Sequence, residues 1–178
     1  SVWLDYLSRG LLESGGLAKK MKEDAITGVT SNPSIFQKAI AEGDAYDAQL
    51  KELAQESDLR EVFIALAAQD IGNACDLLKP VWDGGVGLKG WVSMEVDPTL
   101  AYQTEETYDQ AKRFHALLDR PNLYVKIPAT KPGLPAIEDM IAAGKSINVT
   151  LIFSLERHAE VMEAYVRGLE RLVAGGGD

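Results

Sequence analysis

The sequence has few cysteines and histidines. Its 178 residues include one cysteine, Cys75, and two histidines, His115 and His158. A single cysteine excludes an internal disulfide, and its place in an apolar helical pattern predicts a buried, reduced thiol. The histidines lie in helical patterns and form no His/Cys cluster with the spacing of metal ligands. We therefore expect no metal site, and we interpret both histidines as ordinary helix residues.

The sequence also lacks long hydrophobic runs and blocks of basic residues. No apolar run approaches the roughly 20 residues that a membrane span requires, and no signal-peptide pattern opens the chain. The formal net charge is −9 and the pI is about 4.8, so no basic surface for nucleic acid is expected. No G-x-G-x-x-G follows the first apolar run, which argues against a dinucleotide site. These absences indicate a cytoplasmic protein that binds neither nucleic acid nor membrane.

Short runs rich in β-branched and aromatic residues predict strands, and apolar residues at helical spacing predict helices between them. A hydrophobic content of 46% is enough for a buried core. The predicted strands cover residues 2–5, 25–31, 88–96, 123–129 and 146–154. The predicted helices cover residues 59–78, 107–118 and 156–173, with 37–57 as an additional helical excursion. The apolar face predicted for the last helix consists of Val161, Tyr165, Leu169, Leu172 and Val173.

The alternation of strands and helices predicts the α/β class, because parallel neighbours are normally joined by helical crossovers. No low-complexity linker divides the chain, so we predict a single domain over residues 1–178. A doubly wound sheet and a closed (β/α)8 barrel both fit this order. Polar residues near the carboxyl ends of all five strands favour the barrel, whose site lies at those ends. They are Asp5, Asn32, Glu95, Lys126, Asn148 and Thr150, and in a barrel they would meet in one pocket.

One of these residues, Lys126, lies in the apolar run "LYVKIPA". A lysine among apolar walls loses solvation, which favours its neutral amine and makes it a nucleophile toward a carbonyl carbon. Carboxylates such as Asp5 and Glu95 can move protons while a Schiff base forms and a carbon–carbon bond breaks. The residue types therefore indicate Schiff-base chemistry.

Each residue also has a simpler interpretation. Lys126 fits a strand-end lysine that extends its amine to water. Asn32 followed by Pro33 is typical of a helix start, with asparagine as the N-cap. Asp5 and Glu95, taken singly, fit solvated charges. The agreement in position across five strands is what favours a site.

Five motifs, in this order and spacing, resemble the successive strand signatures of the transaldolase family, in particular its longer bacterial type: "VWLDYLSR", "GVTSNPSIF", "VSMEVDP", "YVKIPAT" and "NVTLIFS". The resemblance extends from residue 2 to about residue 170. It implies a (β/α)8 TIM barrel of the class I aldolase type that acts in the pentose phosphate pathway without a cofactor. The implied reaction transfers a dihydroxyacetone unit between sugar phosphates, converting sedoheptulose 7-phosphate and glyceraldehyde 3-phosphate to erythrose 4-phosphate and fructose 6-phosphate.

The same motifs imply a role for each site residue. Lys126 would be the Schiff-base lysine. Asp5 would take the proton of the donor hydroxyl as the carbon–carbon bond breaks. Glu95 would act with Thr150 through a water during carbinolamine formation and dehydration. The residues implied in binding the donor hydroxyls and the lysine-bound intermediate are Thr30, Asn32 and Asn148.

The sequence departs from this family in length. A full barrel has eight strands, and about five strand–helix units are present here, so we expect a domain that is incomplete at its C-terminus. The residues that bind phosphate are expected beyond residue 178. The open sheet edge would be covered by a C-terminal segment or by another copy in a homo-oligomer. Two other functions fit: a related class I aldolase that cleaves a sugar phosphate with the same lysine, and a barrel fragment without activity.

Overall fold

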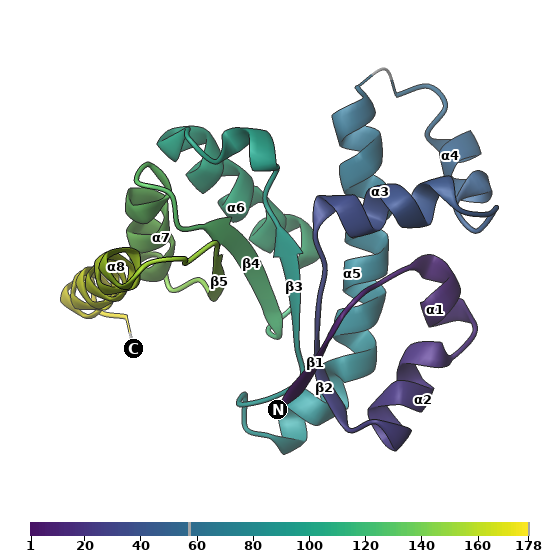
Figure 1. Cartoon of the computed structure of the whole chain (residues 1–178), viewed down its shortest axis with the longest axis horizontal. Helices are drawn as coiled ribbons and strands as arrows, with labels where there is room; N and C mark the ends of the chain where they lie inside the picture. Colours follow the sequence, from purple (N-terminus) through teal and green to yellow (C-terminus); the bar gives the residue numbers. More distant parts are fainter. Residues whose placement is uncertain (57, 178) are drawn as a thin grey trace. The chain divides into compact units, whose positions relative to one another are not determined.

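The computed structural model describes residues 1–56 and 58–177. The chain divides into two compact units, which are drawn in Figure 1. Unit 1 comprises Ser1–Ser93 with Arg120–Asn122, and unit 2 comprises Met94–Asp119 with Leu123–Asp178. The prediction of one domain over residues 1–178 stays a prediction.

The strands follow one another in the sheet in the same order as in the sequence, β1-β2-β3-β4-β5. The register shows parallel pairing of β1 with β2, β2 with β3, and β4 with β5. A doubly wound sheet would reverse its strand order at a switch point, so this order favours a barrel. The strands are β1 (Val2–Asp5), β2 (Ile26–Thr30), β3 (Trp91–Glu95), β4 (Leu123–Pro128) and β5 (Ile147–Thr150).

At least one helix follows each strand in the chain, which confirms the predicted alternation. The helix of residues 59–78 continues to Gly84. The described part of the expected excursion, residues 37–56, contains the end of a helix that begins at Pro33 and one short helix, Asp47–Glu52, and residue 57 lies outside the described residues. The helices are α1 (Arg9–Glu13), α2 (Gly16–Glu23), α3 (Pro33–Ala41), α4 (Asp47–Glu52), α5 (Leu59–Gly84), η1 (Pro98–Leu100), α6 (Thr104–Leu118), α7 (Gly133–Ala142) and α8 (Leu155–Ala174).

The core of unit 1 lies between β2 and the helices that pack on it. Val29 of β2, Leu17 of α2 and Ile71 of α5 are fully buried. Figure 1 shows α5 as a long helix, and α5 packs on β2. Cys75 on α5 is buried and unbridged, which confirms the predicted thiol.

Burial alternates along β4 in unit 2. Val125 and Ile127 are fully buried, whereas Tyr124 and Lys126 are half-buried on the other face. The helices α6 and α7 pack on β4, and α7 also packs against both α6 and α8. The apolar face of β4 therefore lies against helices, and the face with Lys126 is the one that can hold a site.

The apolar face predicted for α8 is partly wrong. Val161 is buried, but Tyr165, Leu169 and Val173 are 48%, 36% and 67% exposed. The buried face instead contains Ala164 and Gly168, which let α8 approach α7 closely. Small side chains at a helix contact weigh little in a hydrophobic pattern, so the pattern favoured the larger residues on the exposed side.

Two predicted strands extend too far. The third strand begins at Trp91 instead of residue 88, because Gly87 and Gly90 have positive φ angles and form a turn. The fifth ends at Thr150 instead of residue 154, because Leu151 has a φ of 62°, which no strand residue adopts.

The α7–α8 contact gives a stability prediction. A Cβ added at Gly168 would lie 2.7 Å from the Ile141 Cβ and 2.8 Å from the Glu138 carbonyl oxygen. We expect Gly168→Ala to lower the free energy of unfolding by about 1–3 kcal/mol through overpacking, measured by urea denaturation. The higher helix propensity of alanine would by itself raise the free energy of unfolding by about 1 kcal/mol. A stabilised Gly168→Ala variant would therefore contradict the close contact of α7 with α8. The control is Gly175→Ala at the end of the same helix, where only carbonyl oxygens at 3.4 Å are met; a change within about 0.5 kcal/mol is expected.

The buried thiol gives a second prediction. Burial raises the pKa of Cys75 to about 12, so almost no thiolate is present near neutral pH. We expect iodoacetamide at about pH 8 to leave the folded chain unmodified and to alkylate it fully in guanidinium chloride, as measured by intact mass. Rapid alkylation of the folded chain would contradict the burial of this residue of α5.

Candidate functional site

The carboxyl end of β4 holds an ion pair between Lys126 and Glu95. The lysine Nζ lies 3.1 Å from Glu95 Oε2, and the side chains are only 12% and 13% exposed. Lys126 therefore does not extend its amine freely into water, as the simpler interpretation required. A carboxylate at this distance can accept the ammonium proton and leave a nucleophilic amine.

Strand pairing in unit 2 brings these two side chains together. The N–H of Val96, the residue after Glu95, donates to the carbonyl oxygen of Lys126 at 3.1 Å. Glu95 ends β3, and Lys126 lies two residues before the end of β4. The pair is thus fixed by the main chain as well as by charge.

Asn148 and Thr150 of β5 lie on the same face as Lys126. In the parallel register Lys126 is opposite Asn148, and Pro128 is opposite Thr150. Residues two apart in a strand share a face, and opposite residues of paired strands do so as well. All residues of β5 are half-buried, so amide and hydroxyl groups flank the lysine in a partly desolvated position.

Unit 1 brings Asp5 and Thr30 together. Asp5, the last residue of β1, is opposite Thr30, the last residue of β2. Asp5 is exposed, while Thr30 Oγ1 is buried and hydrogen-bonds to no group of the described residues. An unpaired buried hydroxyl is costly, and a ligand hydroxyl would offset that cost.

Asn32 serves as the N-cap of α3. Its Oδ1 accepts a hydrogen bond of 3.0 Å from the Ile35 N–H, and Pro33 is the first helical residue. The simpler interpretation is therefore confirmed as a structural role. The cap uses the side-chain oxygen and not the amide nitrogen, which can donate to a ligand.

The sequence analysis missed Thr130, which shapes the loop after β4. Its Oγ1 donates to the carbonyl oxygen of Ala101 and accepts from the Gly133 N–H at 3.0 Å. A Cβ on Gly133 would lie 2.2 Å from the Pro128 carbonyl oxygen. The N-cap of α7 is Pro132, so Thr130 stabilises the turn before the helix. The Pro132-Gly133 pair is the turn signal that could have identified this loop.

His115 lies in α6, as expected, and its Nε2 is 2.9 Å from the Ser146 carbonyl oxygen. Since a carbonyl oxygen only accepts, Nε2 carries the proton. Burial lowers the pKa of this imidazole, so it is a neutral, hydrogen-bonded helix residue.

Residues 1–56 and 58–177 contain no group of three or more His, Cys, Asp or Glu side chains that could hold a metal ion. Within the same ranges, no helix has the length and apolarity needed to cross a membrane.

The chain matches known proteins over nearly its full length. A family model described as "Transaldolase/Fructose-6-phosphate aldolase" matches residues 2–175. The sequence is 51% identical to a transaldolase of Mycobacterium ulcerans over 179 aligned positions, which cover 100% of this chain and 48% of that protein. It is 52% identical to a transaldolase of Mycobacterium tuberculosis, with 96% of this chain and 46% of that protein covered. The chain thus spans about half the length of the curated relatives it matches.

These matches confirm the resemblance seen in the motifs. They also confirm the (β/α)8 barrel class, since the sequential order of parallel strands is that of a barrel. The convergence of all the predicted residues in one pocket stays a prediction. By its sequence, the chain belongs to the Transaldolase/Fructose-6-phosphate aldolase family.

Proposed function

We propose that this chain carries the Schiff-base chemistry of a transaldolase, which moves a dihydroxyacetone unit from a ketose phosphate to an aldose phosphate. Sedoheptulose 7-phosphate and glyceraldehyde 3-phosphate are the proposed substrates, and erythrose 4-phosphate and fructose 6-phosphate the products, within the pentose phosphate pathway of the cytoplasm. The Lys126–Glu95 pair, held by main-chain bonding and largely removed from water, is the observation that carries the proposal.

The first step joins the substrate carbonyl carbon to Lys126. Glu95 accepts a proton from the Nζ, and the amine attacks to give a carbinolamine. Glu95 then acts with Thr150 through a water to protonate the departing hydroxyl, so that water leaves and the protonated Schiff base remains. Thr150 lies on the lysine face of β5, two residues beyond the partner of Lys126.

The second step breaks the carbon–carbon bond. Asp5 takes the proton of the donor hydroxyl as the bonding electrons move toward the Schiff base, and the aldose phosphate leaves. The remaining enamine attacks the acceptor aldehyde, and Asp5 returns the proton. Thr30, Asn32 and Asn148 bind the hydroxyls of the donor and of the intermediate. The buried, unpaired hydroxyl of Thr30 supports this role.

A second candidate is an aldolase that releases the triose without transferring it. The matching family includes fructose 6-phosphate aldolase by its description, and both reactions use the same lysine. Comparing free dihydroxyacetone with transfer to erythrose 4-phosphate separates the two activities.

A third candidate is a chain without activity of its own. This possibility is supported by length, because the chain spans about half the length of its relatives. The proposed phosphate-binding residues would then lie on a segment beyond residue 178 or on another copy, which would also cover the free edge of β5.

Borohydride trapping tests the proposal directly. The intact mass is measured before and after treatment with fructose 6-phosphate and borohydride, and any adduct is mapped by peptide digestion. We expect a dihydroxyacetone-sized increment on the peptide that contains Lys126. Lys126→Ala should abolish every adduct. Asp5→Ala should still form an adduct on Lys126, shifted from the dihydroxyacetone size toward the size of uncleaved fructose 6-phosphate, and should slow turnover by roughly 10²- to 10⁴-fold, as for a lost general base. An increment that persists in Lys126→Ala would refute the assignment.

The role of Glu95 gives a separate prediction. Glu95→Gln keeps the shape of the side chain but cannot accept a proton, so the rate of trapping should fall by roughly 10²- to 10⁴-fold. Quenching with borohydride at successive times gives this rate. The matched control is Glu163→Gln on α8, whose side chain is 73% exposed, and it should trap at the unmodified rate. Equal rates in both variants would remove Glu95 from the proton path.

A further inference from the structure

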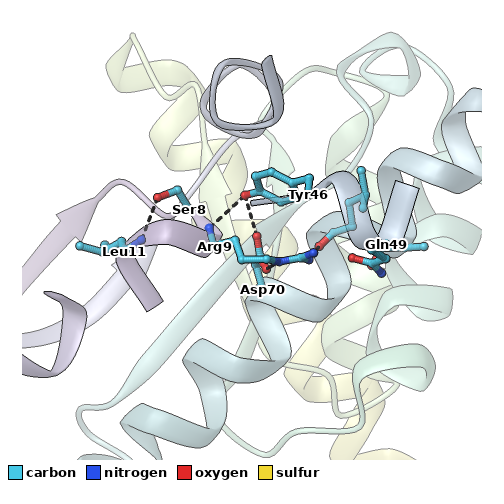
Figure 2. Close-up of polar contacts among 8 residues, drawn as sticks. Ser8, Arg9, Leu11, Tyr46, Gln49 and Asp70 are labelled. Carbon is cyan, nitrogen blue, oxygen red and sulfur yellow. Dashed lines mark hydrogen bonds and ion pairs between the residues drawn. The ribbon is translucent and has the colours of Figure 1, made fainter. Parts of the chain in front are cut away.

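Unit 1 contains a buried polar network that the steps above do not use (Figure 2). Arg9 Nε donates to Asp70 Oδ1 at 2.9 Å, and the Tyr46 hydroxyl donates to Asp70 Oδ2 at 2.8 Å. The guanidinium carbon also lies 4.5 Å from the centre of the Tyr46 ring. Arg9, Tyr46 and Asp70 are 6%, 2% and 0% exposed.

Stability alone is a weak reason for such a network. Burying a charge pair costs desolvation that its mutual attraction barely offsets, and apolar residues of similar volume often serve as well. Burial raises the pKa of Asp70, although hydrogen bonds from Tyr46 and Arg9 oppose that rise. What the polar groups add is a directional arrangement that apolar packing does not specify.

The network also fixes main chain. The N–H of Arg9, the first residue of α1, donates to the Tyr46 hydroxyl at 3.0 Å. This N–H has no partner inside the helix, and the tyrosine supplies one. The Tyr46 hydroxyl therefore bonds the backbone of one segment and the side chain of another helix at the same time.

Two of the segments that meet here continue from proposed site residues. Arg9 lies four residues after Asp5, and the intervening Leu7 is fully buried. Tyr46 follows α3, whose N-cap is Asn32, and α3 also contacts α5 through the perpendicular rings of Phe36 and Phe63. The third segment is α5, which carries Asp70 on its buried face.

We propose that Arg9, Tyr46 and Asp70 are positioning residues that hold the segments following Asp5 and Asn32 against α5. The inference rests on the proposed function, since it assigns the network to the proton-transfer step at Asp5. It differs from a purely structural role in one respect: loosening the network should impair carbon–carbon cleavage more than covalent capture at Lys126.

Tyr46→Phe is the test variant. It removes the hydroxyl that bonds both the Arg9 N–H and Asp70, while the ring and its contact with the guanidinium remain. The matched control is Asp76→Asn on α5, the helix that also carries Asp70; it breaks an exposed ion pair with Arg120. Trapping, steady-state kinetics with fructose 6-phosphate and erythrose 4-phosphate, and amide hydrogen exchange of residues 5–12 are measured for both variants.

For Tyr46→Phe we expect trapping at Lys126 to be retained and kcat to fall roughly 10- to 100-fold, because a misplaced proton acceptor slows chemistry. KM should stay within about twofold, and exchange of residues 5–12 should be at least about tenfold faster than in the control. If Tyr46→Phe does not fold, Arg9→Lys replaces it. That variant keeps the cation and the main-chain bond, and kcat should fall at least about threefold.

The outcomes separate this inference from the proposed function. Trapping in the unmodified chain, with kcat in Tyr46→Phe equal to that in the control, would overturn the positioning role and leave the proposed function intact. No trapping in the unmodified chain would count against the proposed function. In that case amide hydrogen exchange tests the positioning role of the network. Equal exchange rates of residues 5–12 in Tyr46→Phe and in Asp76→Asn would overturn that role.

Discussion

The parallel register of neighbouring strands is the constraint on which both groups of proposed site residues depend. In parallel strands, residues in register share a face and their carboxyl ends lie at the same edge. Asp5 is therefore beside Thr30 in unit 1, and Lys126 is beside Asn148 in unit 2. A slip of one residue would turn each of these side chains to the opposite face. The chemistry proposed here thus rests on hydrogen bonds of the main chain as much as on the reactive groups.

Two ion pairs among the described residues, Lys126–Glu95 and Arg9–Asp70, are largely buried, and their surroundings differ. The side chains of Lys126 and Glu95 are 12% and 13% exposed, so this pair is not completely enclosed. Asp70 is fully buried, and Arg9 keeps only 7%. The second carboxylate oxygen of Asp70 accepts a hydrogen bond from the Tyr46 hydroxyl. Partial access suits a pair whose proton moves during reaction, whereas complete enclosure suits a pair that holds chain segments in place.

Much of the fold and of the proposed site could be predicted from the sequence, because alternation is a local signal. Burial in β4 has the predicted period of two, and Lys126 lies on the less buried face. The hydrophobic pattern did not predict the buried face of α8, because the small residue Gly168 makes the contact there. It also did not predict the end of β5, because the positive φ angle of Leu151 ends that strand. It also gave no reason to join Arg9, Tyr46 and Asp70, which are 37 and 24 residues apart along the chain.

The sequence by itself determined the α/β class, the alternating order of strands and helices and the family, since these follow from hydrophobic period and from motifs of adjacent residues. Only the tertiary structure decided which polar groups meet. The approach of Glu95 to Lys126 within 3.1 Å requires two strands to pair in one register. The enclosure of Asp70 by Arg9 and Tyr46 requires segments from three helical regions to pack together. Distances between side chains far apart in sequence depend on packing, and no local pattern encodes them.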